Sequence, residues 1–419
     1  MIGVPDRVHA STLLSRRMVI RAMAAAAGAA AVAPSVVAAQ AAPPPGGAGP
    51  ATPPSTTTNP PRDFTAPSVY FQDPDIINVD PSFGGLIQGN TTIQRLWHGD
   101  VNGKPILWAE GPAWNAVGNY LIFSDIPNNR QLRWLDDDGH VSVFRQPSAN
   151  SNGNIWDFQG REISMEHLNR RVTRYDHDGG STVLADSWNG KRLNSPNDAA
   201  AHPDGSIWFT DPPYGGQLYE GDVDQPGGPT NPDSKINARA GQPTGFPMFK
   251  RELPTQVYRW DPSGSVDAVI KDDQVPDPNG ISFSHDYKKL YVASTGKGPG
   301  DKIVGGQGDM WVFDVSADGK SVSNMQKFSD CVVDGIKCGP DGVRTDIYGN
   351  VWLSSNAGQN VGYNGLTCWS PAGKLLGRMR LPEVIGNFTF GGPKRNRIFM
   401  AGSTSLYAVY VGVQGSAPS

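Results

Sequence analysis

The sequence predicts an all-β fold, a six-bladed β-propeller built of four-stranded antiparallel blades. Three observations support this prediction. The 419 residues include 50 Gly and 36 Pro, which suits many short strands joined by turns. Runs of alternating apolar and polar residues flank Asp/Gly or Pro/Gly turns, which is the pattern of β-hairpins. One such unit recurs six times, and recurrence of this kind indicates a repeat architecture.

The recurring unit is a hairpin that starts at a polar residue and ends in aromatic or β-branched residues. Its copies occupy residues 110–125, 152–166, 197–211, 279–293, 341–355 and 387–401. Hairpins of a second type, such as "LRWLDDDGHVSVF" and "VYRWDPSGSVDAVI", lie between these copies. Two hairpins per repeat make a four-stranded sheet, and a period of about 42–46 residues suits one propeller blade. A two-sheet sandwich is the alternative, but six paired hairpins fit it poorly.

Two intervals between copies are longer than the others and are interpreted as insertions. Residues 215–253 are rich in Gly and Pro and are expected to form a long loop after the third blade. The Gly-rich stretch "STGKGPGDKIVGGQGD" expands the fourth blade. The segment "TIQRLWHGD", before Glu110, is predicted to be an extra strand that pairs with the last blade. Such pairing would close the ring and remove an exposed sheet edge.

The N-terminal segment has the features of an export signal. In residues 1–41, "SRRMVIR" precedes an Ala-rich apolar run and the small residues of "AQA", which is the order found in signal peptides. Arg16-Arg17 after a Ser resembles the twin-arginine signal, which implies the twin-arginine export machinery, a bacterial periplasmic product and no stable membrane anchor after cleavage. A retained N-terminal anchor is the alternative.

Residues 42–62 are rich in Pro, Gly and Thr and are predicted to be a disordered linker, because they have little apolar surface to bury. Residues 63–415 then form a single propeller domain. The net charge of −4 and the lack of a basic stripe argue against a nucleic-acid partner. Three Cys are too few for a disulfide scaffold. Cys331 and Cys338 could form a disulfide in an oxidising compartment or remain two core thiols.

The six repeat starts are the candidate site, because the innermost strand of each propeller blade lines a central channel. Residues at the start of each repeat should therefore meet at one mouth of that channel. All six side chains carry oxygen, and they are Glu110, Asn152, Asn197, Asn279, Asp341 and Asn387. At a strand entry a single Asn would be explained by turn formation alone, but six oxygen-bearing residues in one ring require more.

Carboxylate and amide oxygens suit a hard divalent cation, with calcium the favoured ion and zinc, magnesium or manganese possible. Glu110, Asn279 and Asp341 together would give a site of zero net charge once such an ion is bound. No His starts a repeat and no Cys cluster is present, so a nitrogen and sulfur zinc site is not expected. Asn152 and Asn387 need only bond backbone or water, and they are left out of the ligand set.

Four stretches resemble motifs of the gluconolactonase/senescence-marker-protein (regucalcin) family: "EGPAW", "LNSPNDAAAHPDGSIWFTDPPYG", "PNGISFSHDYKKLYVAST" and "GPDGVRTDIYGNVWLSS". The resemblance covers about residues 95–412 in the same order. It implies a six-bladed propeller that hydrolyses sugar lactones with one divalent metal in the channel. It also implies that Glu110, Asn279 and Asp341 are the metal ligands, and that Asp341 is the base that activates the attacking water.

Within the same resemblance, Asn197 matches an Asn that lies beside the metal and binds substrate. Animal members of the family carry an Arg two positions before that Asn, where this chain has Ser195, so its sugar recognition departs from theirs. The stretch "EHLNRR" could turn Glu166 and His167 toward substrate. The favoured interpretation is a surface salt-bridging cluster with Arg170 and Arg171.

The function predicted from these observations is metal-dependent hydrolysis of a small-molecule sugar lactone to its hydroxy acid. An alternative keeps the metal site but replaces the substrate by another ester or a phosphotriester. An alternative of another class is a non-catalytic propeller that binds a ligand or protein, with residues 215–253 as its surface. No G-x-S-x-G motif is present, so a serine hydrolase is not supported.

Overall fold

The computed structural model describes residues 53–66, 72–215, 252–295, 308–358 and 360–417. The predicted signal peptide, the first part of the predicted linker and nearly all of the predicted insertion at 215–253 lie outside these residues. Within the described ranges, no helix has the length and apolar composition needed to cross a membrane.

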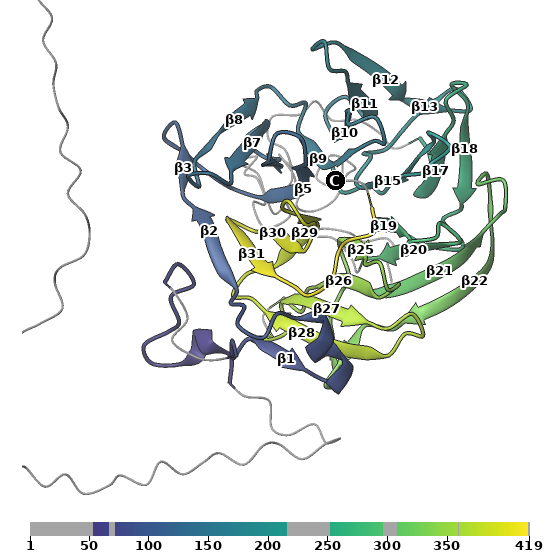
Figure 1. Ribbon diagram of the computed structural model, residues 1–419. Coiled ribbons are helices and arrows are strands. Elements are labelled where there is room, and N and C mark those ends of the chain that lie inside the picture. Colours follow the sequence, from purple (N-terminus) through teal and green to yellow (C-terminus); the bar gives the residue numbers. More distant parts are fainter. Residues whose placement is uncertain (1–52, 67–71, 216–251, 296–307, 359, 418–419) are drawn as a thin grey trace, which may run out of the picture. The chain divides into compact units, whose positions relative to one another are not determined.

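The described residues form six antiparallel blades arranged around a central axis, which confirms the predicted propeller (Figure 1). Four blades follow the chain in order from the inner to the outer strand. They are β5–β8 (Ala109–Asn115, Tyr120–Asp125, Arg130–Leu135, Val141–Arg145), β9–β12 (Ser151–Trp156, Glu162–Glu166, Arg171–Tyr175, Ser181–Ala185), β15–β18 (Ala199–Ala201, Ile207–Asp211, Gln256–Trp260, Val266–Ile270) and β19–β22 (Pro278–Phe283, Lys289–Ser294, Asp309–Val315, Val322–Ser329).

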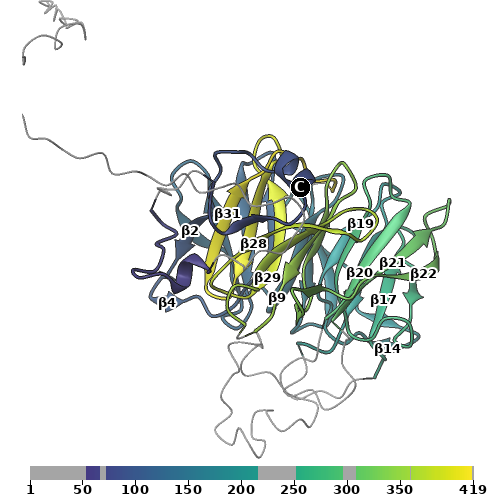
Figure 2. The same cartoon turned by 90° about the horizontal axis from the view of Figure 1, so that it is seen from below.

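The fifth and sixth blades recruit strands from the N-terminal side of the domain. The fifth contains β25–β28 (Val343–Thr345, Val351–Ser355, Gly365–Trp369, Leu375–Arg380), with β1 (Ile76–Asn78) added outside β28. The sixth contains β29–β31 (Ile385–Gly391, Arg397–Gly402, Ser405–Tyr410), and β2 (Gln94–His98) supplies its outer strand. The predicted closure of the ring by "TIQRLWHGD" is therefore confirmed, and Figure 2 shows the blades seen from the side.

Three short hairpins and two 3-10 helices complete the described elements. The hairpins are β3–β4 (Asp100–Val101, Lys104–Pro105), β13–β14 (Ser187–Trp188, Lys191–Arg192) and β23–β24 (Val332–Val333, Ile336–Lys337), and the helices are η1 (Ser55–Thr57) and η2 (Pro81–Leu86).

The end of the predicted linker packs on the domain, in contrast to the expected disorder. Arg62 donates to Asp73 and Asp75, and Ser55 is buried against Asp75. Asp73 also accepts from the backbone N–H of Ile93 at 2.7 Å. The amino-acid composition did not predict this packing, because composition reports only how much apolar surface can be buried. Buried ionic hydrogen bonds hold the segment instead.

The two insertions also differ in position from part of the prediction. The longer one leaves β16 after Asp211 and returns at β17, so it lies inside the third blade and does not follow it. The Gly-rich insertion joins β20 to β21 inside the fourth blade, as predicted. Both connect the second strand of a blade to its third.

Aromatic side chains fill the spaces between blades. Trp114 of β5 stacks on Phe399 of β30 with ring centroids 5.2 Å apart, and Trp208 of β16 meets Phe283 of β19 edge-on at 5.5 Å. Each pair joins neighbouring blades, so burial of these aromatic side chains holds the six blades together.

All three Cys are buried and free, so Cys331 and Cys338 are two core thiols, which was one of the two alternatives. Burial raises the pKa of Cys331 to about 12, which keeps its thiol protonated.

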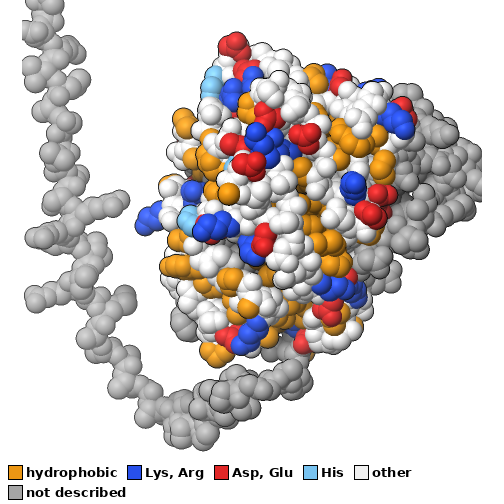
Figure 3. All heavy atoms as spheres, turned by 90° about the vertical axis from the view of Figure 1, so that its right-hand side faces the viewer, with side chains coloured by type: hydrophobic (Ala, Val, Ile, Leu, Met, Phe, Trp, Pro, Cys, Tyr) orange, Lys and Arg blue, Asp and Glu red, His pale blue; other side chains and the backbone are white. Residues whose placement is uncertain are grey.

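The fourth blade and the β23–β24 hairpin that follows it carry paired charges. Lys327 and Lys337 both approach Asp309, at 2.7 and 2.6 Å, and Lys289 pairs with Asp314. Figure 3 shows basic and acidic side chains interspersed on this side of the molecule, with no large area of one sign.

Candidate active site

The structure brings the six repeat starts to one end of the channel. Their strands follow one another around the ring in the order β5, β9, β15, β19, β25 and β29, and β29 contacts β5. Backbone hydrogen bonds join neighbouring starts: the N–H of Gly153 donates to the carbonyl of Asn197 at 2.8 Å, and the N–H of Gly342 donates to Gly386 at 2.9 Å. The four predicted site residues therefore share one mouth.

The inner strands lose regular pairing where the site residues lie. The register shifts between Glu110 and Ala113 in β5, between Pro278 and Ile281 in β19, and between Ile385 and Asn387 in β29. Asn197 and Asp341 stand two residues before the paired parts of β15 and β25. Bulges and unpaired strand starts of this kind change the direction in which side chains point, and they are common beside active sites.

Two glycines allow the starts to approach closely. Gly111 has a φ of +51°, and a Cβ there would lie 2.1 Å from the carbonyl oxygen of Asn152. A Cβ on Gly280 would lie 2.0 Å from the carbonyl oxygen of Asp341. The "EGP" and "PNG" motifs thus use Gly because the backbone of the next blade occupies the space of a side chain.

Glu110 and Asp341 are held close together in an environment that disfavours their charges. Burial raises the pKa of Glu110 to about 8, and the negative charge of Asp198 adds to the rise while the N–H of Gly111 opposes it. Burial and the charges of Glu110 and Asp198 also raise the pKa of Asp341 well above its usual value. Asp341 keeps some exposure, whereas Glu110 is buried. The positive charge of Arg344 opposes the rise at Glu110 without cancelling it, so the two carboxyl groups are not fully compensated.

The neighbouring amides are arranged around these carboxyl groups. The Asn279 amide lies beside Asp341 and the Asn387 amide beside Glu110, and each opposes the rise in the pKa of its carboxyl neighbour. Asn197 is 4% exposed, and within the described part of the chain its side-chain amide makes no hydrogen bond. Asn387 was left out of the predicted ligand set, and here it supports Glu110.

A buried ion pair lies beside the predicted site, and sequence reasoning missed it. Arg344 donates to Asp198 at 3.0 Å from the fifth blade to the third, and Asp198 is fully buried. Asp198 also accepts from the backbone N–H of Ala199 at 2.9 Å. Asp198 directly follows the repeat start Asn197, whereas Arg344 lies three residues after Asp341, so only Asp198 gave a signal in the sequence.

The donors present fit a divalent cation. Glu110 and Asp341 provide two negative charges and Asn279 a neutral oxygen, while Arg344 cancels the charge of Asp198, so a dication would make the group neutral. The raised pKa values of both acids show that the protein alone does not stabilise their charged forms. Among the described residues, no three His, Cys, Asp or Glu side chains form a metal-binding cluster, and the predicted set contains only two.

Residues 108–404 match the model of the SMP-30/Gluconolactonase/LRE-like region family. The chain belongs to this family. Gluconolactonase of Zymomonas mobilis is 27% identical over 354 residues, which cover 80% of this chain and 85% of that protein. A solved gluconolactonase from Xanthomonas campestris is 29% identical with a TM-score of 0.62, covering 80% of this chain and 95% of that one. Regucalcin of Agrobacterium tumefaciens shares the fold, at 17% identity and a TM-score of 0.54, covering 75% and 93% of the two chains.

In this SMP-30/gluconolactonase family member, Ser195 forms hydrogen bonds with backbone groups and with Asp211. Its hydroxyl donates to the carbonyl of Pro212 at 2.6 Å and accepts from the N–H of Gly215 at 3.1 Å. Its own N–H donates to Asp211 at 2.8 Å, and Ser195 has no exposed surface. The "NSPND" turn is thus tied to the end of β16, and Ser195 does not take the place of a substrate-binding cation.

The predicted surface cluster at "EHLNRR" is wrong, because Glu166 and His167 are both buried. Glu166 accepts from Asn169 at 2.7 Å and Arg171 at 2.7 Å, so only its salt bridge to Arg171 follows the prediction. His167 lies beside Asn152, with its Nε2 3.3 Å from the Asn152 amide nitrogen. The signal that could have found it is its place directly after the second strand of a repeat.

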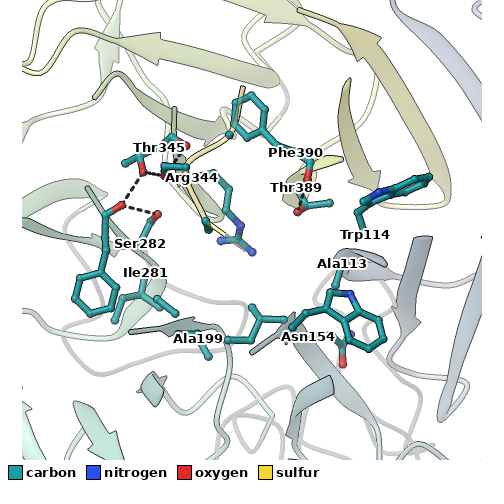
Figure 4. A pocket seen from close by; sticks show the side chains of 18 of the residues that line it. Ala113, Trp114, Asn154, Ala199, Ile281, Ser282, Arg344, Thr345, Thr389 and Phe390 are labelled. Carbon is teal, nitrogen blue, oxygen red and sulfur yellow. Dashed lines mark hydrogen bonds between the residues drawn. The ribbon is translucent and has the colours of Figure 1, made fainter. Parts of the chain in front are cut away.

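At the opposite end of the channel lies a small apolar cavity of about 50 Å³. Trp114, Phe283 and Phe390 line it, and none of the four predicted site residues does. Figure 4 shows the Arg344 guanidinium pointing into this space between the strands. The C-terminal residues cross this end, since Ser416 donates from its backbone N–H to the Thr345 carbonyl at 3.0 Å. Arg344 therefore separates the apolar cavity from the polar mouth.

Proposed function

We propose that this protein is a metal-dependent hydrolase that opens a sugar lactone to its hydroxy acid, with the divalent cation, calcium first among the candidates, held at the polar mouth of the channel. The observation that carries the proposal is the convergence of Glu110 and Asp341. Burial raises the pKa of both acids, and the charge of Asp198, joined at Asp341 by that of Glu110, raises it further, so the polar mouth favours a bound cation.

The reaction class follows from the family. Membership in the SMP-30/gluconolactonase family and the similarity to two gluconolactonases make this chain a lactone-hydrolysing enzyme, a hydrolase that acts on carboxylic ester bonds. A lactonohydrolase of Aspergillus oryzae is also similar, with 23% identity over 251 residues. The choice of a sugar lactone rests on the polar side chains that surround the mouth.

Glu110, Asn279 and Asp341 would hold the cation, which when bound supplies a positive charge that polarises a carbonyl group and makes water more acidic. Asn197 would orient the substrate carbonyl through its unpaired amide. Asp341 is the base, because it is the carboxyl group of the pair that keeps some exposure. It acts only when ionised, and the protein alone disfavours that form, so activity is expected to require an added divalent cation.

The hydrolytic step then consumes one water for each lactone. The water oxygen bonds to the carbonyl carbon, and Asp341 accepts the proton that the water releases. The bond between the carbonyl carbon and the ring oxygen breaks, and the ring oxygen takes up the proton as it becomes a hydroxyl. One lactone and one water give one hydroxy acid.

The test is a substrate and metal panel on the wild type and Asp341→Ala. Protein purified without added metal is first assayed for bound metals by elemental analysis. Hydrolysis of glucono-δ-lactone, an aryl ester and a phosphotriester is then measured with calcium, zinc, magnesium or manganese. We expect lactone hydrolysis that depends on the cation and falls by roughly 10²–10⁴-fold in Asp341→Ala. Retained cation-dependent activity in that variant would exclude this site, and faster phosphotriester turnover would favour the other substrate class.

We further propose that the enzyme works in the bacterial periplasm, motivated by Arg16-Arg17 and the Ala-rich run that follows. The double variant Arg16→Lys, Arg17→Lys should remain in the cytoplasm with its N-terminal segment uncleaved. Fractionation of cells that express each form measures this, and equal periplasmic amounts of the two forms would contradict the proposal.

A further inference from the structure

His167 and Asn152 form a buried polar pair beside the proposed site. They are 3% and 5% exposed, and the His167 Nε2 lies 3.3 Å from the Asn152 Nδ2. In the described part of the chain, the His167 Nδ1 and the Asn152 Oδ1 are buried and have no hydrogen-bond partner. Buried polar atoms are rarely left unpaired, so two in one contact pair need an explanation.

The unpaired atoms offer one donor and one acceptor. Burial lowers the pKa of His167 to about 3, so the ring is neutral and carries one N–H. If Asn152 donates to Nε2, the free atoms are the Nδ1–H donor and the Oδ1 acceptor. If the amide is turned over, Nε2–H donates to Asn152, and the free atoms are an Nδ1 acceptor and an amide donor. In both arrangements the pair lacks one donor partner and one acceptor partner.

The pair adjoins the residues proposed to bind and open the lactone. Asn152 stands between Glu110 and Asn197 in the ring of repeat starts. The N–H of Gly153, the next residue, donates to the Asn197 carbonyl at 2.8 Å. A Cβ on Gly215 would lie 2.7 Å from Cγ and 2.8 Å from Nδ1 of His167 and 2.8 Å from the Ser195 Cβ, so Gly215 lies between His167 and the "NSPND" turn.

The turn that carries His167 is firmly anchored. Glu166 accepts from Asn169, Arg171 and Tyr175 at 2.7, 2.7 and 3.0 Å. Arg170 donates from Nε to the carbonyl of Leu193 at 2.6 Å, which ties this turn to the start of the third blade. The imidazole is therefore held in place before any ligand arrives, as preorganised recognition requires.

We propose that His167 and Asn152 form a subsite for a neutral hydroxyl group on the lactone ring. A hydroxyl is both a donor and an acceptor, and it can satisfy both unpaired atoms in either arrangement of the pair. A carboxylate or phosphate would satisfy only the donor. The subsite rests on the proposed lactonase function and makes the enzyme select hydroxylated lactones over unsubstituted ones.

The test compares kcat/KM for glucono-δ-lactone and δ-valerolactone, which has the same ring without hydroxyls. Wild-type enzyme should prefer the hydroxylated lactone, since sites built to bond a hydroxyl reject analogues that lack it by up to about 10⁴-fold. His167→Phe and Asn152→Leu remove the polar atoms and keep similar volume. Each should lower kcat/KM for glucono-δ-lactone by about 10²-fold or more and leave that for δ-valerolactone nearly unchanged.

Two further variants sharpen the result. His167→Gln restores a donor and an acceptor and should recover part of the preference, whereas the exposed His140→Phe should leave both substrates unaffected. Equal losses on both lactones in His167→Phe and Asn152→Leu would overturn the inference, since a purely structural role predicts that outcome. A wild type that opens both lactones at equal rates would also overturn it and would leave the lactonase function standing.

A binding measurement separates the inference from the proposed function. The ring nitrogens of His167 should shift in ¹⁵N NMR spectra when 1,5-anhydroglucitol, a cyclic polyol that cannot be hydrolysed, is added to the metal-loaded wild type. The shift supports the subsite even if no lactone is turned over, and an unchanged His167 signal at saturating polyol contradicts it.

Discussion

Glu110 and Trp114 lie four residues apart on β5, as do Asn279 and Phe283 on β19, and each pair spans the channel from its polar mouth to its apolar end. At the polar mouth both acids have raised pKa values and the Asn152 Oδ1 is unpaired. At the other end the aromatic rings pack, stacked or edge-on, in the spaces between blades. The same six strands therefore carry two different kinds of surface.

The difference teaches where this fold places stability and where it places chemistry. The apolar end follows the ordinary rules of packing, with large rings fully buried between blades. The polar mouth breaks those rules, because its inner strands bulge and its charges are buried without full compensation. Departures of this kind are expected at functional sites, where the remainder of the fold compensates for them. Substitutions at the two ends should therefore affect different measurements.

The largest expected effect is the loss of activity in Glu110→Gln. The variant removes a proposed cation ligand, so kcat/KM for glucono-δ-lactone should fall by roughly 10³–10⁴-fold, or about 4–5.5 kcal/mol. Because the pKa of Glu110 is raised to about 8, the neutral acid dominates in metal-free protein at neutral pH, and Gln resembles that form. Urea unfolding without metal should therefore change little. A large drop in metal-free stability with full activity would reverse the comparison between the two ends.

The second effect is a loss of stability at the apolar end in Trp114→Ala. Trp114 is fully buried and stacks on Phe399, so removing its ring should lower the free energy of unfolding by about 4 kcal/mol. The kcat of the molecules that remain folded should stay near the wild-type value. Val117→Ala, on the same side but 95% exposed, is the matched control and should change neither quantity. A kcat loss as large as that in Glu110→Gln would show that the two ends are not separate.

Much of this architecture was predictable, and the reasons are local. The alternation within hairpins and the repeat spacing predicted the blades, and an unpaired strand sequence before Glu110 predicted the closure by β2. The pairing of β1 with β28 was not predictable, because a three-residue strand leaves almost no periodic signal. The burial of Arg62 with Asp73 was hidden for a different reason, since a Pro-rich composition does not reveal a specific ionic contact.

Some residues of the candidate site were predictable from the sequence and others were not. The convergence of Glu110, Asn197, Asn279 and Asp341 could be predicted because each starts a repeat, and equivalent positions of a closed ring must converge. His167 and Arg344 could not, since neither occupies a repeat start and their partners lie in the ring only after folding. Whether a charged residue such as Arg344 faces the channel or solvent depends on a register that the bulges alter.

The third effect concerns the ion pair that separates the two ends. Arg344→Met would leave Asp198 buried without its partner and should lower the free energy of unfolding by about 3 kcal/mol. The double variant Asp198→Asn, Arg344→Met removes both charges and should recover most of that loss. Urea unfolding of the two single variants and the double variant measures the coupling. Losses that simply add would mean that the pair does not act as a unit.

The smallest effect is a pH dependence confined to the polar mouth. The pKa of Glu110 is about 8 in the folded protein and 4.5 in its ordinary state, so between these values the unfolded chain releases a proton that the folded chain keeps. The contribution of Glu110 to the stability of metal-free protein should be greatest below about pH 4.5, fall as the pH rises and level off above about pH 8, and the difference in stability between wild type and Glu110→Gln measures it. Calcium requires the ionised acids, so its affinity should rise over the same window by up to about tenfold per pH unit for each proton released. Calorimetric titration in buffers of different ionisation enthalpy counts those protons. Trp114→Ala should retain the slope of affinity against pH, Glu110→Gln should reduce it, and a calcium affinity that is flat from about pH 5 to 8 would contradict the assignment of the raised acids to the cation site.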